Sequence, residues 1–560
     1  MDYKTHIAKK LDIKTLSLEE LYSYIEIPPN NDMGDFALPC FKLSKILRKS
    51  PIAIADELQK NFVLDEYVKE CTAVNGYLNF KIDRQTYANK LLAEITEGKD
   101  LFGSSNEGEN KTVCIDYSSI NIAKPFHIGH LSTTVIGSAL CKIFKFLGYK
   151  VVGINHLGDY GTQFGKLIVA YKLWSSEQAV KEGKLKELSR IYVKFHEEAK
   201  SNPALEDEAR RYFKLIEDGD KEANVLFELF KDITLKEVDK IYKLLNVTFD
   251  SYAGESFYND KMAPVIQELK EKGLLKKSEG ADVVDLEEYG MSPCLILKSD
   301  GSSLYATRDI AAAMYRKKTY DFYKCLYVVA YQQNLHFKQF FKVIELMGKE
   351  WAKDLFHVSY GMVSLESGSM STRAGNVVLL EDVINKTIEK AYKVIEEKNP
   401  NMPDKENTAK KIGTGAVIFG ALSNNKIKDI VFSYDKVLNF EGETCPYVLY
   451  SVARINSVLK KFGEPSSYNG YQMNADEYGV VSVLGKFKSI VELSAKNYEP
   501  SYVTRYAIEL SSAFNKFYMG NKIGCEDENA KNFRLTLSKC VKIVLTNALS
   551  LLGIETVEEM

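Results

Sequence analysis

The sequence lacks the features of a membrane protein or a secreted protein. None of its 560 residues lies in an apolar run of about 18 residues, the length that a membrane-spanning helix requires. The opening stretch, MDYKTHIAKKLDIKTL, is charged and has no apolar core of the kind that a signal peptide contains. We therefore expect a cytoplasmic protein with no membrane partner.

Cysteine and histidine are few and scattered. The nine cysteines form no CxxC pair, and the chain has only seven histidines, so neither a zinc knuckle nor a disulfide framework can be identified. Scattered thiols in a protein of this kind are mostly small buried hydrophobic residues. We predict no tightly bound protein metal.

Neither sign of charge is in excess. The 74 basic and 76 acidic residues give a net charge of −2. A near-neutral chain can still gather basic residues on one face, so the composition neither supports nor excludes a nucleic-acid partner. At 560 residues the chain is too long for a single hydrophobic core, and two to four domains are expected.

The most informative stretch covers residues 111–137. Its first part, KTVCIDY, predicts a strand, and the small residues after His130 predict the start of a helix. A helix start offers unpaired N–H groups and a partial positive charge, which suits a phosphate. His127 and His130 could both reach an anionic oxygen there, and Gly129 would let a ligand approach the backbone closely. A structural histidine in an α/β turn is the alternative.

Two motifs in this region resemble a known family. Residues 125–130, PFHIGH, resemble the HIGH signature of class I aminoacyl-tRNA synthetases. The preceding NIAKP and the later NHLGDYGTQFG, at 155–165, narrow the resemblance to arginyl-tRNA synthetases. The resemblance implies an arginine–tRNA ligase that forms arginyl-adenylate from L-arginine and ATP and transfers arginine to the 3′-terminal adenosine of tRNA(Arg). ATP would enter with Mg²⁺ as a substrate complex, and we expect a monomer.

The resemblance also implies a fold. It predicts an α/β protein with a class I Rossmann-like, parallel-sheet catalytic domain at residues 109–388. A small α+β domain at residues 1–108 would precede it as an additional tRNA-binding domain. An all-α anticodon-binding bundle at residues 389–560 would follow.

Local patterns agree with this division at the N-terminus. Ser50 followed by proline predicts the start of a helix. The pair Asn75-Gly76 predicts a tight turn between two strands within residues 71–82. The segment that begins at Gly34 resembles the N-terminal extension of the family, which implies tRNA contact; a helix–sheet module without RNA contact is the alternative. The polar residues 101–110 are a predicted linker.

In the central region, short apolar runs alternate with helical patterns, as in a parallel sheet covered by helices. The runs are residues 113–117, 151–155, 326–330 and 358–363. Ligands bind at the carboxyl ends of such strands, so the polar residues that follow the runs should converge. A charged insertion at about 170–300 is predicted to be helical first and strand-like near its end.

Residues from about 390 onward are predicted to be helical throughout, with a polar interruption at 466–470. Tyrosine and arginine side chains at helical spacing suit stacking on unpaired bases. Together with the resemblance of the closing segment to the family's anticodon-binding domain, this spacing makes Tyr447, Arg454 and Asn456 candidate tRNA-binding residues. Packing of the tyrosines inside the bundle is the alternative.

The candidate catalytic residues are His127, His130 and Lys124. Nucleotidyl transfer needs in-line positioning and neutralisation of charge, which hydrogen-bond donors can supply. The second loop of class I enzymes, usually KMSKS, corresponds here to SMSTRAGN at 369–376 and lacks both lysines. Either Lys124 or Arg373 could replace them. The resemblance gives the ATP-binding residues as His127, Gly129, His130, Gly361, Met362, Val363, Ser371 and Arg373; a core strand is the alternative for 361–363.

The motif YATRD at 305–309 resembles the family's arginine-recognition motif. A carboxylate at Asp309 could bind a guanidinium through two hydrogen bonds, which favours arginine over lysine. Without the resemblance, an Asp beside an Arg is more often a surface feature. The resemblance gives the arginine-binding residues as Asp116, Asn121, His127, Tyr305, Asp309 and Gln333, with Gln333 preferred to Gln332 by spacing alone.

Three other functions fit parts of the sequence. Another class I synthetase, of the glutamyl, glutaminyl or cysteinyl type, is disfavoured by YATRD, by NHLGDYGTQFG and by the scattered cysteines and histidines. A non-catalytic tRNA-binding paralogue is favoured only by the lysine-free second loop. A nucleotidyltransferase that makes a small adenylylated metabolite would not need residues 390–560.

Overall fold

The chain folds into two compact units. The computed structural model describes residues 3–11, 13–28, 33–299, 305–365 and 378–560. One unit comprises residues 1–99, 465–485 and 516–540, and the other comprises residues 100–464, 486–515 and 541–560. Parts of the C-terminal helices therefore belong to the same unit as the N-terminal region. The three predicted domains, with boundaries at 108 and 388, stay predictions.

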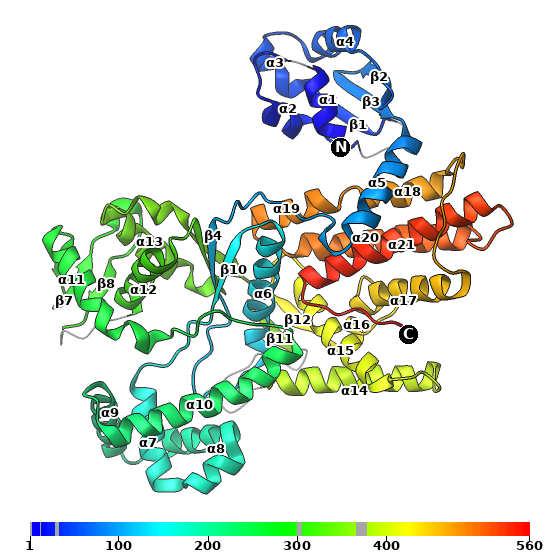
Figure 1. Ribbon diagram of the computed structural model, residues 1–560. Coiled ribbons are helices and arrows are strands. Elements are labelled where there is room, and N and C mark those ends of the chain that lie inside the picture. The colour runs from blue at the N-terminus through cyan, green and yellow to red at the C-terminus, as the bar shows by residue number, and fades with distance from the viewer. Residues whose placement is uncertain (1–2, 12, 29–32, 300–304, 366–377) are drawn as a thin grey trace. The chain divides into compact units, whose positions relative to one another are not determined.

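The first unit is built on a small antiparallel sheet with strand order β1-β3-β2 (Figure 1). Asn75 and Gly76 have φ angles of 50° and 82°, so the predicted tight turn between β2 and β3 is confirmed. Ser50 accepts a hydrogen bond from the N–H of Ala53 at the start of α4, as its capping pattern predicted. The elements are α1 (Tyr3–Leu11), α2 (Leu18–Tyr24), β1 (Phe36–Pro39), α3 (Phe41–Leu47), α4 (Pro51–Asn61), β2 (Val68–Val74), β3 (Tyr77–Ile82), α5 (Arg84–Gly98) and α18 (Ala475–Leu484).

A four-stranded parallel sheet forms the centre of the second unit. Its order is β10-β9-β4-β5, and every neighbouring pair is parallel, which confirms the predicted Rossmann-like sheet. Helix α6 packs against β4, β5 and β9. Helix α12 packs against β4, and α13 packs against β10 (Figure 1). The elements are β4 (Thr112–Asp116), α6 (Leu131–Phe146), β5 (Lys150–Ile154), α12 (Tyr305–Tyr320), β9 (Lys324–Ala330), α13 (Asn334–Leu346) and β10 (Leu355–Tyr360).

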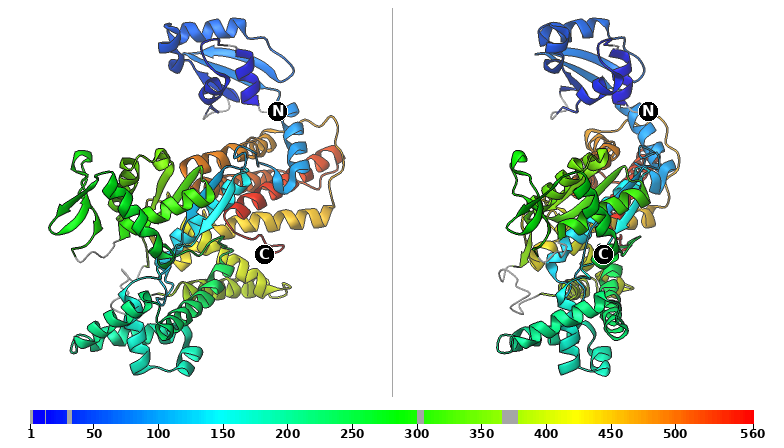
Figure 2. Two further views of the ribbon diagram at one scale, coloured as in Figure 1. Left: turned by 60° about the vertical axis from the view of Figure 1, so that its left-hand side comes forward. Right: turned by 90° about the vertical axis from the view of Figure 1, so that its left-hand side faces the viewer.

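The insertion between β5 and α12 has the predicted order of helices before strands. Its long helices pack as one group (Figure 2), and a small antiparallel sheet of order β6-β7-β8 follows. The elements are α7 (Thr162–Trp174), α8 (Glu177–Glu198), α9 (Ala204–Glu217), α10 (Lys221–Leu244), α11 (Met262–Glu271), β6 (Leu275–Ser278), β7 (Ala281–Val284) and β8 (Cys294–Leu297).

The structure corrects the prediction at two strands. The run 358–363 is not one strand: β10 ends at Tyr360, and β11 (Val363–Leu365) pairs in parallel with β12 (Ile430–Phe432). A Cβ atom on Gly361 would lie 2.3 Å from the carbonyl of Lys428, so the chain leaves the first sheet where another backbone crosses it. The prediction that residues from about 390 onward are all helical is therefore wrong at β12, because a three-residue strand gives no periodic signal of its own.

The rest of the C-terminal region is helical, with an interruption that includes residues 466–470, as predicted. Within the described residues, no helix combines the length and the apolar character needed to cross a membrane. The elements of the second unit in this region are α14 (Leu380–Lys398), α15 (Lys405–Leu422), α16 (Tyr434–Val437), α17 (Cys445–Phe462) and α19 (Phe487–Asn497); α20 (Ser501–Gly520) and α21 (Glu528–Leu551) contribute to both units.

Candidate active site

The predicted site residues follow the carboxyl ends of the parallel strands. The loop after β4 carries the HIGH motif, the loop after β5 carries His156, and a 3-10 turn, η6 (Tyr331–Gln333), follows β9. The backbone of Asn121 bridges to that of Gly158, which joins the first two loops. The predicted convergence of polar residues at this edge of the sheet is confirmed for the loops after β4 and β5.

The two HIGH imidazoles lie together at the start of α6. His127 caps a short 3-10 turn, η3 (Ile128–His130), and the ring centroids of His127 and His130 are 4.0 Å apart. Nδ1 of His127 accepts a hydrogen bond from the N–H of Gly129 at 3.1 Å, and Nδ1 of His130 accepts one from the N–H of His127 at 3.2 Å. In a neutral imidazole whose Nδ1 accepts, Nε2 carries the hydrogen.

Both rings are neutral near pH 7. Burial lowers the pKa of His127. Burial, together with the neighbouring His127 and Lys124, lowers the pKa of His130 to about 3. The Nε2–H of His127 is therefore a donor without formal charge, which suits hydrogen bonding to phosphate oxygens. Nδ1 of His130 lies 3.2 Å from the N–H of His127 and 3.3 Å from its carbonyl, and the shorter contact, in which Nδ1 accepts, assigns a second Nε2–H donor to His130. Gly137, further along α6, keeps the helix close to β4, since a Cβ atom there would lie 2.2 Å from Cγ of Tyr117.

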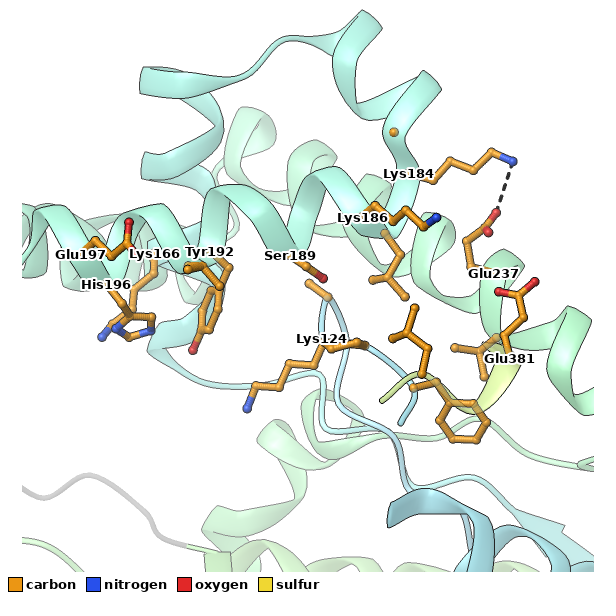
Figure 3. Close-up of a pocket in the computed structure, with 18 of the residues that line it drawn as sticks. Lys124, Lys166, Lys184, Lys186, Ser189, Tyr192, His196, Glu197, Glu237 and Glu381 are labelled. Carbon is orange, nitrogen blue, oxygen red and sulfur yellow. Dashed lines mark ion pairs between the residues drawn. The ribbon is translucent and has the colours of Figure 1, made fainter. Parts of the chain in front are cut away.

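Lys124 lines a large cavity beside the HIGH loop. The cavity has a volume of about 1530 Å³ and lies among residues 123–126, α8, α10 and the start of α14. Figure 3 shows Lys124 on the loop, with Tyr192 and His196 of α8 lining the same cavity. Lys166 and Lys184, which also line it, are paired with Glu206 and Glu237 at 2.7 and 3.3 Å.

The second loop lies outside the described residues, so Ser371 and Arg373 have no structural account. The chain is described again just after this loop, where it pairs with the HIGH loop. The N–H of Ile128 donates to the carbonyl of Val378 at 3.1 Å, and the N–H of Leu380 donates to the carbonyl of Phe126 at 3.0 Å. Val378 and Leu380, which follow the second loop, are thus attached next to the histidines.

The segment 361–363 is engaged by another part of the chain. The N–H of Gly361 donates to the carbonyl of Lys426 at 2.7 Å, and the N–H of Met362 donates to the carboxylate of Asp429 at 2.7 Å. Val363 is buried as the first residue of β11. The core-strand alternative therefore holds for Val363, while contact of this backbone with adenine stays a prediction.

Asp309, in the first turn of α12, is flanked by two histidines that the sequence motifs did not identify as site residues. Its Oδ2 lies 2.6 Å from Nε2 of His336, and its Oδ1 lies 4.0 Å from Nε2 of His156. His156 follows β5 and His336 lies on α13. The sequence placed His156 at this edge of the sheet, because it follows the run 151–155 and lies in NHLGDYGTQFG, but gave it no role beside Asp309; His336 had no sequence signal.

A second carboxylate lies near Asp309. Glu255 begins the 3-10 turn η4 (Glu255–Lys261), and its carboxylate is 3.8 Å from a guanidinium nitrogen of Arg308. Burial raises the pKa of Glu255 to about 7, with the charges of Asp309 and Asp159 adding to the rise and Arg308 opposing it. The guanidinium of Arg308 also lies 4.2 Å from the ring centroid of Tyr160. Arg308 is thus held inside the protein, with Asp309 next to it in the sequence.

The other predicted arginine contacts differ in accessibility. Tyr305, Asn121 and Gln333 are exposed, so a ligand could reach them. Asp116, in contrast, is buried, and its Oδ2 is paired with Nη2 of Arg316 at 2.7 Å. Asp116 is therefore already engaged inside the protein, and its direct contact with arginine stays a prediction.

The three predicted tRNA-binding residues all lie on α17. The hydroxyl of Tyr447 is 3.2 Å from that of Ser512, and Arg454 donates to Asn515 at 2.7 Å. The amide of Asn456 donates to the carbonyls of Val557 and Glu558 at 3.2 and 3.0 Å, so this side chain anchors the last residues of the chain to α17.

Comparisons with known families cover most of the chain. The family described as tRNA synthetases class I (R), catalytic domain, matches residues 92–434. The DALR anticodon binding domain matches residues 448–560, and the Arginyl tRNA synthetase N terminal domain matches residues 1–82.

Individual relatives agree along the full length. The arginine–tRNA ligase of Clostridium beijerinckii is 52% identical over 564 residues, with 100% of both chains covered. The arginine–tRNA ligase of Clostridioides difficile is 51% identical with the same coverage. Among solved structures, Thermus thermophilus arginyl-tRNA synthetase matches with a TM-score of 0.84 at 26% identity over 96% of each chain. Since the family matches occur in this order and the identity extends from end to end, the chain belongs to the arginyl-tRNA synthetase family.

Proposed function

We propose that the chain is an arginine–tRNA ligase. It activates L-arginine with ATP to arginyl-adenylate and pyrophosphate, and it transfers the arginine to the 3′-terminal adenosine of tRNA(Arg) during translation. The observation that carries this proposal is the environment of Asp309, a carboxylate flanked by two imidazoles near the strand ends that also carry the HIGH histidines. Membership of the family supports the same activity.

In the activation step, the carboxylate of arginine attacks the α-phosphate of ATP, an O–P bond forms, and pyrophosphate leaves. The Nε2–H groups of His127 and His130 donate to phosphate oxygens, which steadies the charge that develops during transfer. Because these donors are neutral, positive charge has to come from Mg²⁺ that enters with ATP and from a nearby cation. We assign that cation to Lys124, with Arg373 as the alternative.

Selection of arginine depends on the carboxylate of Asp309. A carboxylate has two acceptor oxygens in one plane, which match the fork of donors of a guanidinium. A lysine substrate would present a single ammonium group and lose the second hydrogen bond. Tyr305, Asn121 and Gln333 are exposed and complete the proposed arginine site with His127 and Asp116.

Binding of tRNA is assigned to α17 and its neighbours. Tyr447 and Arg454 supply an aromatic face and a guanidinium to unpaired anticodon bases, and Asn456 contributes by holding the C-terminal residues in place. A cytoplasmic location and a monomeric state remain predictions.

The test is an aminoacylation assay with total tRNA and each of the twenty amino acids. Arginine alone should be attached, and a pyrophosphate-exchange assay with and without tRNA should show arginine-dependent exchange. Attachment of another amino acid, or binding of tRNA without any attachment, would refute the proposed function.

A further inference from the structure

Arg316 of α12 is a buried cation that the proposed reaction does not explain. Its side chain is 1% exposed, and Nη2 lies 2.7 Å from the carboxylate of Asp116. Among the residues that the structure describes, Nε and Nη1 have no hydrogen-bond partner, and the guanidinium lies 5.3 Å from the ring centroid of Tyr327. Burying donors without partners is unfavourable, and apolar residues often replace a buried ion pair without loss of stability. Packing alone therefore does not account for a guanidinium at this place.

A second contact of Arg316 leads toward Asp309. Nη2 also lies within hydrogen-bond distance, 3.4 Å, of Nδ1 of His156. A guanidinium stays protonated and cannot accept a hydrogen bond, so Nδ1 of His156 must be the acceptor. Burial lowers the pKa of His156, which leaves the ring neutral with a single hydrogen. That hydrogen is therefore on Nε2, the atom that lies 4.0 Å from Oδ1 of Asp309.

The arrangement gives each oxygen of Asp309 its own imidazole. His336 lies against Oδ2 at 2.6 Å, and Nε2 of His156, which carries the hydrogen, lies 4.0 Å from Oδ1. Asp309 and Arg316 are seven residues apart on α12, two helical turns along one face, so His156 can lie between them. In the other tautomer of His156, a lone pair would face Oδ1 and repel the ionised carboxylate.

We propose that Arg316 is a positioning residue for arginine recognition. By donating to Nδ1 of His156, it directs the Nε2–H of that ring toward Asp309 and thereby orients the carboxylate for a guanidinium. This role rests on the proposed function of Asp309. It requires no contact between Arg316 and the substrate.

Removing Arg316 alone would leave Asp116 as an uncompensated buried charge, and such a variant could fail to fold. The test variant is therefore Asp116→Asn/Arg316→Met in the full-length chain, which removes both charges. Asp116→Asn alone keeps Arg316, which can still donate to the amide oxygen of the asparagine, and so separates the effect of the carboxylate charge. Its circular dichroism spectrum is compared with that of the unchanged protein first, because Arg316 then lacks its counter-charge. Lys318→Met is the matched control, because Lys318 is an exposed cation two residues further along the chain.

The first measurement determines the tautomer of His156 by ¹⁵N NMR of protein labelled at histidine. The signal of His156 is identified as the one that disappears in the variant His156→Gln. We expect the Nε2–H tautomer in the unchanged protein, in Lys318→Met and in Asp116→Asn. We expect a mixture of tautomers in the double variant. The Nδ1–H tautomer in the unchanged protein would overturn the proposal.

The second measurement compares the KM for arginine and for ATP in pyrophosphate exchange with tRNA present. In the double variant the KM for arginine should rise several-fold relative to Asp116→Asn, because the carboxylate of Asp309 would no longer reliably face the N–H group whose nitrogen lies 4.0 Å from its Oδ1. The KM for ATP should stay within about two-fold, since the HIGH histidines are untouched. An equal rise in both values would mean a general structural effect and would overturn the proposal.

A third comparison uses His156→Gln as the background. The glutamine amide can turn an N–H toward Asp309 without help, so loss of Arg316 should then have little further effect on the KM for arginine. An undiminished effect would overturn the proposal. If the unchanged protein uses another amino acid, the proposed function itself fails. If it uses arginine and the double variant behaves like Asp116→Asn, only the role of Arg316 fails.

Discussion

Replacing Asp309 by asparagine is the sharpest test of how the chain selects its amino acid. The change keeps the shape of the side chain and removes its negative charge. It also replaces one acceptor oxygen with an NH₂ donor, either beside His336, which lies 2.6 Å from Oδ2, or beside His156. The variant can therefore not pair with a guanidinium through two acceptor oxygens.

The expected loss is large. Truncating one partner of a buried, hydrogen-bonded charge pair costs about 2–5 kcal/mol. Asp309 is partly buried, with 27% of its side chain exposed, so we take about 3 kcal/mol, which corresponds to a rise of about 100-fold in the KM for arginine. The ATP site depends on the HIGH histidines, so its KM should change by less than about three-fold.

The assay is arginine-dependent pyrophosphate exchange in the presence of tRNA, with both substrates varied. Asp321→Asn is the matched control, because Asp321 is an exposed aspartate just after the same helix and is paired with Lys317 at 2.8 Å. Equal changes in the two KM values, or a change for arginine no greater than in the control, would refute the role of Asp309 in guanidinium binding.

Four further predictions concern the rest of the site and its support. His127→Ala should lower adenylate formation by about 100-fold with an unchanged circular dichroism spectrum, since a preorganised donor is lost; near-normal exchange would contradict the central role of the HIGH motif. Lys124→Ala should impair use of ATP more than use of arginine in the same assay, and a silent change would return the role to the second loop. Burial raises the pKa of Glu255 to about 7, so this carboxyl favours folding at low pH, and that contribution is lost as the pH rises through about 7. Glu255→Gln should therefore melt at a higher temperature than the unchanged protein at pH 8 and at a similar temperature at pH 5; a difference independent of pH would refute this. Gly361→Ala should lower the free energy of unfolding by about 2 kcal/mol in urea titrations, because its Cβ would overlap a crossing backbone, whereas Gly479→Ala, where a Cβ meets nothing within 4 Å, should not.

Local sequence signals predicted those elements whose stability is local. The turn at Asn75-Gly76 requires positive φ angles, which these residues adopt readily, so it could be identified without tertiary information. The cap at Ser50 satisfies an N–H within its own first turn. The strands β4, β5 and β9 are continuous apolar runs because both faces of a parallel sheet are buried.

Contacts between distant segments could not be predicted in this way. The strand β12 exists because Ile430 to Phe432 pair with β11, and the break after Tyr360 exists because the backbone of Lys428 crosses Gly361. In both cases the sequence around one segment gives no signal of the distant segment that it contacts.

The sequence by itself determined the strand and helix pattern, the HIGH loop at a strand end and the family that these motifs resemble, because each depends on residues close together in the chain. Only the tertiary structure decided that His156 and His336 flank Asp309 and that Arg316 is paired with Asp116. These residues come from separate loops and helices, and a buried charge finds its partners by the packing of those elements rather than by spacing in the sequence.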